Sequence, residues 1–186
     1  MADGNRAEAS LLAGGYSYDG RPVRTPQFGT ERTFTVALWF RAAAPDDGWQ
    51  TLVKWDYLAV GLRHGLLFAH VYDPETDRER ARTDLPTADL RADRWHHVAY
   101  VCDDTAATLY LDGREVDTTT HDDRIEIAPR GVCLGYIYRD RDTGVHAPEF
   151  DGRIVDARFY ETRLDATTIR EIVAATSPDV AGDSPV

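Results

Sequence analysis

Aromatic side chains with polar neighbours are the residues of this sequence best suited to bind a sugar. An aromatic ring can stack on the apolar C–H face of a sugar, while carboxylates and guanidinium groups hydrogen-bond to its hydroxyls. The alternative for each such aromatic residue is a place in the hydrophobic core. One candidate set consists of Trp49, Trp55, Asp56, Tyr57, His70 and Tyr72, and a second consists of Tyr136, Tyr138, Arg139 and Asp140.

The histidines could supply a general base or metal ligands, but their spacing gives no compact cluster. His96 and His97 are adjacent, so on a strand they point to opposite faces of the sheet and at most one of them enters a common site. His70 shares a strand face with Tyr72, and His146 lies in a late polar segment. These two are the better functional candidates among the histidines.

The two cysteines, Cys102 and Cys133, both lie within apolar runs. We expect buried free thiols rather than a disulfide, because nothing in the sequence indicates export to an oxidising compartment. Asp103 and Asp104 follow Cys102 directly, and their negative charges raise the pKa of a neighbouring thiol and suppress the reactive thiolate. The sequence therefore disfavours a catalytic cysteine.

Acidic residues outnumber basic residues by 32 to 21, giving a formal charge of −11, and Lys54 is the single lysine. Such a charge repels nucleic acid and acidic membrane surfaces, so neither is an expected partner. Hydration of a protein adapted to high salt would explain the same composition without a functional acidic patch. No run approaches the ~20 apolar residues of a membrane span. Since the first residues lack a secretion signal, we expect a cytoplasmic protein, or a domain excised from a secreted one.

Short runs of β-branched, aromatic and aliphatic residues recur at intervals of about ten residues, bounded by Gly, Pro or Asp, which is typical of a β-sandwich. In the clearest run, residues 33–41, Phe34, Val36, Leu38 and Phe40 alternate with other side chains and should form one core face. Further strands are predicted at residues 50–55, 57–63, 66–72, 95–102, 107–111, 114–118, 125–127, 132–138 and 150–160.

Local signals also predict turns, a loop and one helix. Asp112 and Gly113 both tolerate positive φ, which predicts a tight hairpin turn. Residues 73–82 are almost all charged and begin with Asp-Pro, which predicts an exposed loop. Residues 165–175 have apolar side chains at helical spacing, with Asp165 as the expected N-cap.

Three stretches carry a family resemblance: TFTVALWFRA at 33–42, WHHVAYVCDDTAATLYLDGREV at 95–116 and FDGRIVDARFYETRLDATTIREIV at 150–173. In this order they resemble the early strand, the Trp-His-His-Val strand with its Tyr-x-Asp-Gly hairpin, and the closing strand and helix of LamG-like domains in the concanavalin A-like superfamily. The resemblance implies an all-β jelly-roll sandwich of two antiparallel sheets with one short C-terminal helix. We expect a single domain at residues 7–176, with flexible termini at 1–6 and 177–186.

The resemblance also implies where ligands would bind. In this superfamily the ligand surface is usually the concave sheet and the loops at its rim. Many members hold a structural calcium ion, for which Asp19 near the opening strand and Asp156 in the closing strand would be the ligands here. An ion pair between Asp156 and Arg158 is the alternative. Glucanases of this fold carry a Glu-x-Asp-x-Glu triplet, and because the sequence lacks it, we do not expect that activity.

Residues and resemblance together predict a non-catalytic binding module, with a glycan as the favoured ligand and a protein as the alternative. A protein-interaction or assembly subunit is the first competing interpretation. The second is a lyase, cyclase or hydrolase that uses a histidine or tyrosine on the concave face. The sequence leaves the oligomeric state open.

Overall fold

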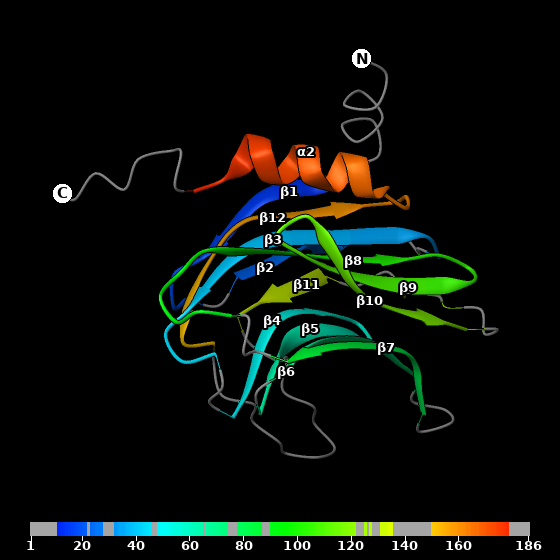
Figure 1. Ribbon diagram of the computed structural model, residues 1–186, viewed down its shortest axis with the longest axis horizontal. Coiled ribbons are helices and arrows are strands. Elements are labelled where there is room, and N and C mark those ends of the chain that lie inside the picture. The colour runs from blue at the N-terminus through cyan, green and yellow to red at the C-terminus, as the bar shows by residue number, and fades with distance from the viewer. Residues whose placement is uncertain are drawn as a thin grey trace.

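The computed structural model describes residues 11–21, 23–27, 32–45, 48–64, 66–73, 78–86, 90–121, 125, 127, 131–135 and 150–178. The strands form two six-stranded antiparallel sheets that pack face to face (Figure 1). Helix α2 (Ala166–Thr176) covers the outer face of the first sheet. The fold is therefore the predicted all-β sandwich with one short C-terminal helix.

The first sheet has the strand order β1-β12-β3-β8-β9-β10. The opening and closing strands of the chain are neighbours in it, with Tyr18 opposite Ile154, as the family resemblance implied. The strands span Leu11–Tyr18 (β1), Gly152–Tyr160 (β12), Phe34–Ala42 (β3), His96–Cys102 (β8), Ala106–Leu111 (β9) and Arg114–Thr120 (β10).

The second sheet has the order β2-β11-β4-β5-β6-β7, in which β4 to β7 follow one another as a meander. Figure 1 shows this sheet strongly curved, with its concave face turned away from the first sheet. The strands span Val23–Gln27 (β2), Gly131–Leu134 (β11), Trp49–Trp55 (β4), Leu58–Arg63 (β5), Leu66–Asp73 (β6) and Arg78–Pro86 (β7).

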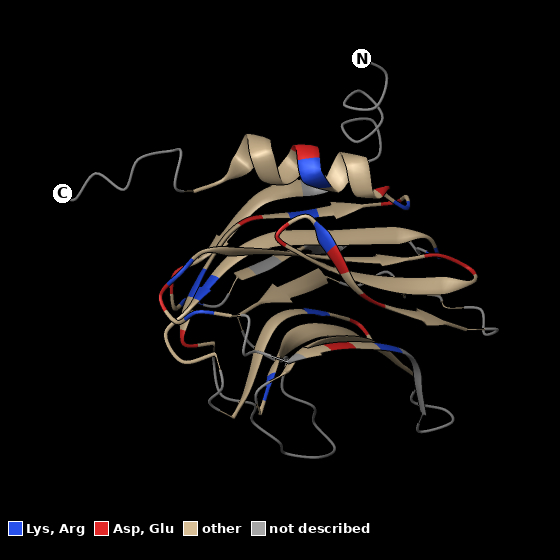
Figure 2. Ribbon diagram, viewed as in Figure 1, with Lys and Arg blue, Asp and Glu red and all other residues tan. Residues whose placement is uncertain are grey.

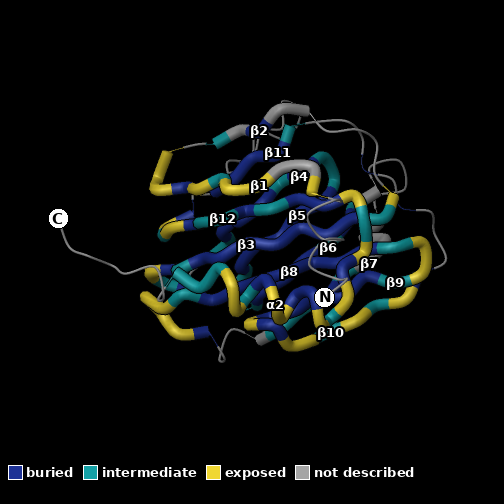
Figure 3. Tube along the Cα trace, turned by 90° about the horizontal axis from the view of Figure 1, so that it is seen from above, coloured by how far each residue is buried: buried dark blue, intermediate teal, exposed yellow. Residues whose placement is uncertain are grey.

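The hydrophobic core lies between the two sheets. Phe34, Val36, Leu38 and Phe40 all point into it from β3 and are at most 1% exposed, which confirms the core face predicted from their alternation. Buried residues follow the central strands, while exposed residues concentrate at strand ends and edges (Figure 3). Charged residues also gather mainly at strand ends and connections (Figure 2).

A β-bulge in β4 changes which face its residues occupy. The pairing with β5 shifts between Thr51 and Val53, so that Leu52 and Val53 both join the core. A bulge inserts one extra residue and interrupts the strict alternation of side chains. As a result, Trp55 lies in the core, whereas Trp49, on the other side of the bulge, faces the concave side.

The turn at Asp112 and Gly113 joins β9 to β10, as predicted, and both residues have positive φ, at 50° and 78°. The Asp112 carboxylate accepts hydrogen bonds from the His97 backbone N–H at 2.8 Å and from His96 Nδ1 at 2.9 Å. Partial burial raises the pKa of Asp112, but these hydrogen bonds lower it by more, so the net pKa lies below its ordinary value. The carboxylate thereby ties the hairpin to β8.

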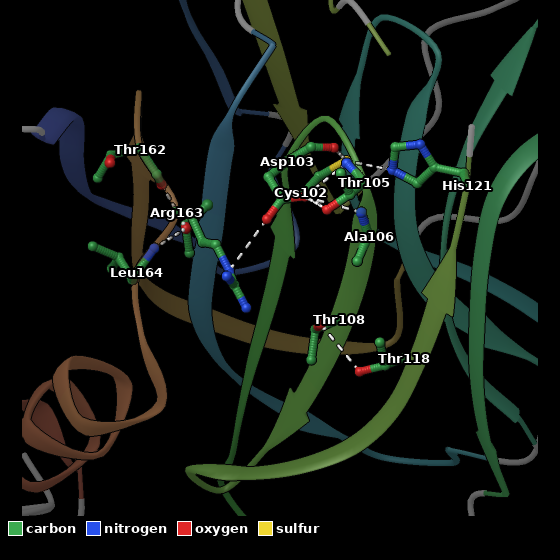
Figure 4. Close-up of polar contacts among 11 residues, drawn as sticks. Cys102, Asp103, Thr105, Ala106, Thr108, Thr118, His121, Thr162, Arg163 and Leu164 are labelled. Carbon is green, nitrogen blue, oxygen red and sulfur yellow. Dashed lines mark hydrogen bonds and ion pairs between the residues drawn. The ribbon is translucent and has the colours of Figure 1, made fainter. Parts of the chain in front are cut away.

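Helix α2 begins as predicted after Asp165, whose side chain accepts a hydrogen bond from the Thr168 backbone N–H at 2.8 Å. The segment before it is anchored by Thr35 of β3, whose hydroxyl donates to Thr162 O at 2.8 Å and accepts from Leu164 N at 3.0 Å (Figure 4). The helix packs on the first sheet through a second apolar cluster of Ala37, Ala99, Val101, Tyr110, Tyr160, Leu164, Ile169 and Ile172.

Strand β7 differs from the prediction. The expected loop at 73–82 is wrong for much of that segment, because β6 continues to Asp73 and β7 begins at Arg78. The charged residues of β7 suit its position at the edge of the second sheet.

The two sheets are joined along the β7 side by side-chain hydrogen bonds from β10. Asp84 N donates to the Asp117 carboxylate at 2.9 Å, and the Thr119 hydroxyl donates to Arg82 O. Both backbone groups belong to an edge strand, which would otherwise present them to solvent.

Some predictions fall outside the described residues. These are the predicted flexible segment 1–6 and residues 179–186 of the one predicted at 177–186, together with the late part of the predicted strand at 132–138, of which β11 covers residues up to Leu134. Within the described ranges, no helix has the length and apolar character needed to cross a bilayer.

Candidate functional site

The concave face of the second sheet carries a row of aromatic side chains. Trp49 of β4 contacts Phe68 of β6 edge-on, with 5.3 Å between ring centroids, and Phe68 contacts His70, also at 5.3 Å. Phe68 and His70 are two residues apart and flank Ala69, which points into the core, so both face the concave side. Trp49, Phe68 and His70 are called the aromatic row below.

Gly61 of β5 makes room for the aromatic row. A Cβ at this position would clash with the Gln50 backbone oxygen and would lie 3.2 Å from two atoms of the Phe68 ring. Because glycine has no side chain, the ring lies directly over the β5 backbone. Phe68 is only 1% exposed, although it belongs to neither of the two core clusters. The Phe68 ring is therefore closely packed against β5.

Arg63 lies over the ring of Trp49. The two residues are opposite each other in the β4–β5 pairing, and the guanidinium carbon is 4.8 Å from the ring centroid. Attraction between a cation and the face of an indole holds the guanidinium in this position. A fixed, partly exposed positive charge thus stands at one end of the aromatic row.

Three buried polar atoms line the same face without a hydrogen-bond partner in the part of the chain that the structure describes: Trp49 Nε1, Thr51 Oγ1 and Asp84 Oδ1. Thr51 and Asp84 lie in one register row with Phe68, and the other oxygen of Asp84 accepts from Arg82 Nε at 2.8 Å. A buried polar group without a partner costs about 1–3 kcal/mol. These atoms are sealed from solvent in this structure, and Thr51 is 0% exposed. A water molecule or ligand that hydrogen-bonded to them would enter only with movement of the neighbouring side chains.

A comparison with protein families identifies the chain. The family model described as the concanavalin A-like lectin/glucanases superfamily matches residues 15–170. The chain belongs to this superfamily. No curated protein sequence matches the chain.

Several solved structures are similar to this chain, among them binding domains of botulinum neurotoxins. The ligand binding domain of serotype D in complex with N-acetylneuraminic acid has a TM-score of 0.67 and 11% identity, covering 89% of this chain and 43% of that one. The receptor binding domain of the C/D mosaic serotype has a TM-score of 0.68 and 9% identity, covering 90% of this chain and 52% of that one. The serotype G binding domain has a TM-score of 0.64 and 8% identity, covering 88% of this chain and 47% of that one. The chain spans about half the length of these proteins, and the likeness is one of fold.

Of the first candidate set, the structure brings Trp49 and His70 together in the aromatic row, with Tyr72 two residues beyond His70 on the same strand. Asp56 and Tyr57 form the β4–β5 turn at the far end of the sheet, where Tyr57 O accepts from Tyr72 N at 3.0 Å. Those two residues are therefore separated from Trp49 by the length of β4.

Trp55 corrects the prediction. It is completely buried in the core, with its ring centroid 5.8 Å from that of Phe34 and 6.1 Å from that of Phe159. The β4 bulge turns it inward, so it cannot contact a ligand on the concave face. The second candidate set, Tyr136, Tyr138, Arg139 and Asp140, lies outside the described residues.

Sequence reasoning missed four residues of the concave site: Thr51, Arg63, Phe68 and Asp84. Period-two alternation from His70 would have found Phe68, since both lie on β6. The cross-strand position of Arg63 over Trp49 and the register of Asp84 depend on strand pairing, for which the sequence carries no local signal.

Of the calcium ligands predicted from the superfamily resemblance, Asp156 lies on β12 and Asp19 follows the neighbouring strand β1, but Asp156 is engaged elsewhere. Asp156 binds Arg158, with both carboxylate oxygens within 3.0 Å of Nε and one at 2.8 Å from an Nη nitrogen. Asp19 is exposed in the bend after β1. Among the residues that the structure describes, no group of three His, Cys, Asp or Glu side chains could hold a metal ion. The calcium site stays a prediction.

Cys102 and His121 form the described pair that most resembles a thiol nucleophile with its base. Cys102 Sγ is 4.0 Å from His121 Nε2 (Figure 4). Burial raises the pKa of Cys102 to about 12, and the charges of Asp103 and Asp104 add to the effect. The thiolate is therefore suppressed, as the sequence predicted, and the pair is not suited to nucleophilic catalysis.

We expect native Cys102 to resist alkylation. With a pKa near 12 instead of the ordinary 9, its thiolate population near neutral pH falls about a thousandfold. The measurement is the iodoacetamide reaction rate at this cysteine by peptide mass spectrometry, using a Cys133→Ser variant, native and in urea. Native labelling at the rate seen in urea would restore Cys102 as a candidate nucleophile.

His96 is also unsuited to act as a general base. Its Nε2 accepts a hydrogen bond from Arg91 N at 3.2 Å, which leaves Nδ1 to donate to Asp112 at 2.9 Å. Both ring nitrogens are thus engaged within the protein. The adjacent His97 points to the opposite face, beneath helix α2, as predicted from its position.

Proposed function

We propose that the chain is a non-catalytic, lectin-like module that binds a glycan on the concave face of its second sheet. The observation that carries this proposal is the group of buried, unpartnered polar atoms on Trp49, Thr51 and Asp84 beside the aromatic row. Sugars present apolar C–H faces to aromatic rings and hydroxyls to polar groups, so both features of the site would be used at once.

Two comparisons support this proposal. The superfamily to which the chain belongs includes lectins in its description. One of the similar solved structures, the botulinum neurotoxin serotype D ligand binding domain, is in complex with N-acetylneuraminic acid, a sugar. The arrangements of Cys102 and His96 also remove two candidate catalytic groups.

The first experiment is a thermal-shift screen of the purified chain against neutral and acidic oligosaccharides, with calcium and EDTA as further arms. A ligand that binds only the native state raises the apparent stability, and the binding constant of each positive sugar is then measured by calorimetry. A shift with calcium that EDTA reverses would support the untested metal site separately from the glycan site.

The substitution Thr51→Val gives the sharpest test of the site. Valine has nearly the shape of threonine, so the change removes only the buried hydroxyl that lacks a partner. We expect glycan affinity to fall about tenfold, or about 1.4 kcal/mol, while the unliganded protein keeps or gains stability, because an unsatisfied buried group is lost. Calorimetry and urea unfolding measure the two effects.

Trp49→Ala should weaken binding by a similar or larger factor, and Trp95→Ala is its matched control. Trp95 also lies under a guanidinium, that of Arg41, at 5.4 Å from the ring centroid, but just before β8 in the first sheet. If Trp95→Ala weakens binding as much as Trp49→Ala does, or if no oligosaccharide binds, the concave-face proposal fails and a protein ligand becomes the interpretation to test.

A further inference from the structure

Arg63 is the charged group whose position on the concave face has no structural explanation beyond its contact with Trp49. It forms no ion pair with any carboxylate among the described residues, whereas Arg82 on the same face is paired with Asp84 at 2.8 Å. The contact with the indole ring, at 4.8 Å from the guanidinium carbon to the ring centroid, is an attraction to the π-system, and the guanidinium has five N–H donors to offer to another partner.

The position of Arg63 also contrasts with the charge of the whole chain. The formal charge is −11, so acidic side chains outnumber basic ones on the chain as a whole. Among the concave-face residues of β4 to β7 whose side chains the structure describes, however, Lys54, Arg63 and Arg82 are basic and Asp84 is acidic. A carboxylate brought by a ligand would therefore meet positive charge at this place on an otherwise acidic protein.

We propose that Arg63 makes the concave site selective for acidic sugars, that is, for saccharides bearing a carboxylate such as uronic or sialic acids. This inference rests on the glycan-binding function proposed above. The guanidinium would bind the carboxylate through two parallel N–H···O hydrogen bonds. Trp49 and His70, the partly exposed members of the aromatic row, would contact the sugar ring, and the partly exposed Asp84 would bind one of its hydroxyls.

The test compares each acidic oligosaccharide with its carboxyl-reduced counterpart, which has the same linkages and stereochemistry but no charge. We expect the full chain to bind at least one acidic oligosaccharide about tenfold or more tightly than the reduced form, because a charge-assisted pair is stronger than a neutral hydrogen bond. Calorimetry gives the dissociation constants, and the NMR signal of the Trp49 indole N–H reports whether each sugar reaches this site.

Variants of Arg63 separate charge from shape. Arg63→Gln should abolish the preference for the acidic form while leaving affinity for the reduced form within about twofold. Arg63→Lys should keep only part of the preference, because an ammonium lacks the planar fork of a guanidinium. Arg41→Gln is the matched control, since Arg41 lies over Trp95 in the same way, and it should keep the full preference. Urea unfolding verifies that all three variants are folded.

The outcomes distinguish the two proposals. Equal binding of the acidic and reduced sugars, with the Trp49 signal shifted by both, would overturn acidic selectivity and leave glycan binding intact. Equal binding of a Glu-rich peptide of matched charge would also overturn it, because the carboxylate alone would then be sufficient. An absence of binding by every saccharide would overturn both proposals. If Arg63→Gln fails to fold, the affinities of Arg63→Lys and the Trp49 signal in the unmodified chain still test acidic selectivity.

Discussion

Replacing Gly135 by alanine is expected to lower the free energy of unfolding by about 3–5 kcal/mol, which combines an overpacking clash with left-handed backbone strain. Gly135 has φ +74°, and an added Cβ would clash with the Tyr18 ring, 2.5 Å from Cζ. Neither side can move away easily. The Gly135 peptide groups bond to Leu52 O at 3.0 Å and Phe150 N at 2.8 Å, and the buried Tyr18 hydroxyl donates to Phe150 O at 3.1 Å.

A matched control separates the clash from the backbone strain. Gly15 has nearly the same conformation, with φ +77°, but an added Cβ would meet no atom within 4 Å. Gly15→Ala should therefore show only the cost of positive φ, about 1–2 kcal/mol. Urea unfolding followed by tryptophan fluorescence measures both variants. Equal losses of stability would show that the Tyr18 ring moves aside and that packing at this junction is looser than described.

Stability is also expected to fall by about 2 kcal/mol between pH 7 and pH 5 because of His97 alone. Burial lowers the pKa of His97 from 6.5 to about 4; Asp112 opposes this effect and Arg158 adds to it. The ring is 1% exposed beneath helix α2 and contacts Trp39 at 5.2 Å. Its Nδ1 has no hydrogen-bond partner among residues that the structure describes, so no hydrogen bond from this atom offsets the burial of a charge.

The direction follows from proton binding in the two states. Below pH 6.5 the unfolded chain protonates this histidine, whereas the folded chain keeps it neutral down to about pH 4. Stability contributed by the neutral ring is therefore complete above pH 6.5 and is lost as the pH falls toward 4. The lowered pKa values of Asp103 and Asp112 affect stability only in more acidic solution, near the ordinary aspartate pKa of 3.8 and below.

Urea unfolding at pH 7 and pH 5 tests the role of His97, with His97→Leu as the variant and His64→Asn as the control. His64 is exposed in the β5–β6 connection at φ 44°, a conformation that asparagine tolerates. His97→Leu should lose the pH dependence and His64→Asn should keep it. A wild-type protein equally stable at both pH values would show that the protonated ring is accommodated in the fold.

The strands β3 to β6 and β8 to β12, the hairpin at Asp112, the helix and the core face of β3 could be predicted, because each depends on a local pattern of residue types. Trp55 could not be placed correctly, since strict alternation puts it on the face of Trp49. The β4 bulge reverses this relation. The hydrogen bonds that define a bulge lie between strands, so the residues of β4 alone do not reveal it.

The candidate site was predicted in part for a related reason. Trp49 and His70 were found by their residue types, and their contact through Phe68 follows from strand pairing. The charged residues of β7 were assigned to a loop because charge usually indicates a solvated connection. At the edge of a sheet, charged side chains also occur in strands, and that edge position depends on the complete topology.

The hydrogen bonds between the side chains of Asp117 and Thr119 and the β7 backbone affect where another β-strand could add to the sheets. At Arg82 and Asp84, the backbone groups that an incoming strand would use are already occupied by side chains of β10. Growth of a fibril or exchange of strands between copies needs free backbone donors and acceptors. At these two positions the protein has closed that route, whereas at the opposite side β1 and β2 are the outermost strands.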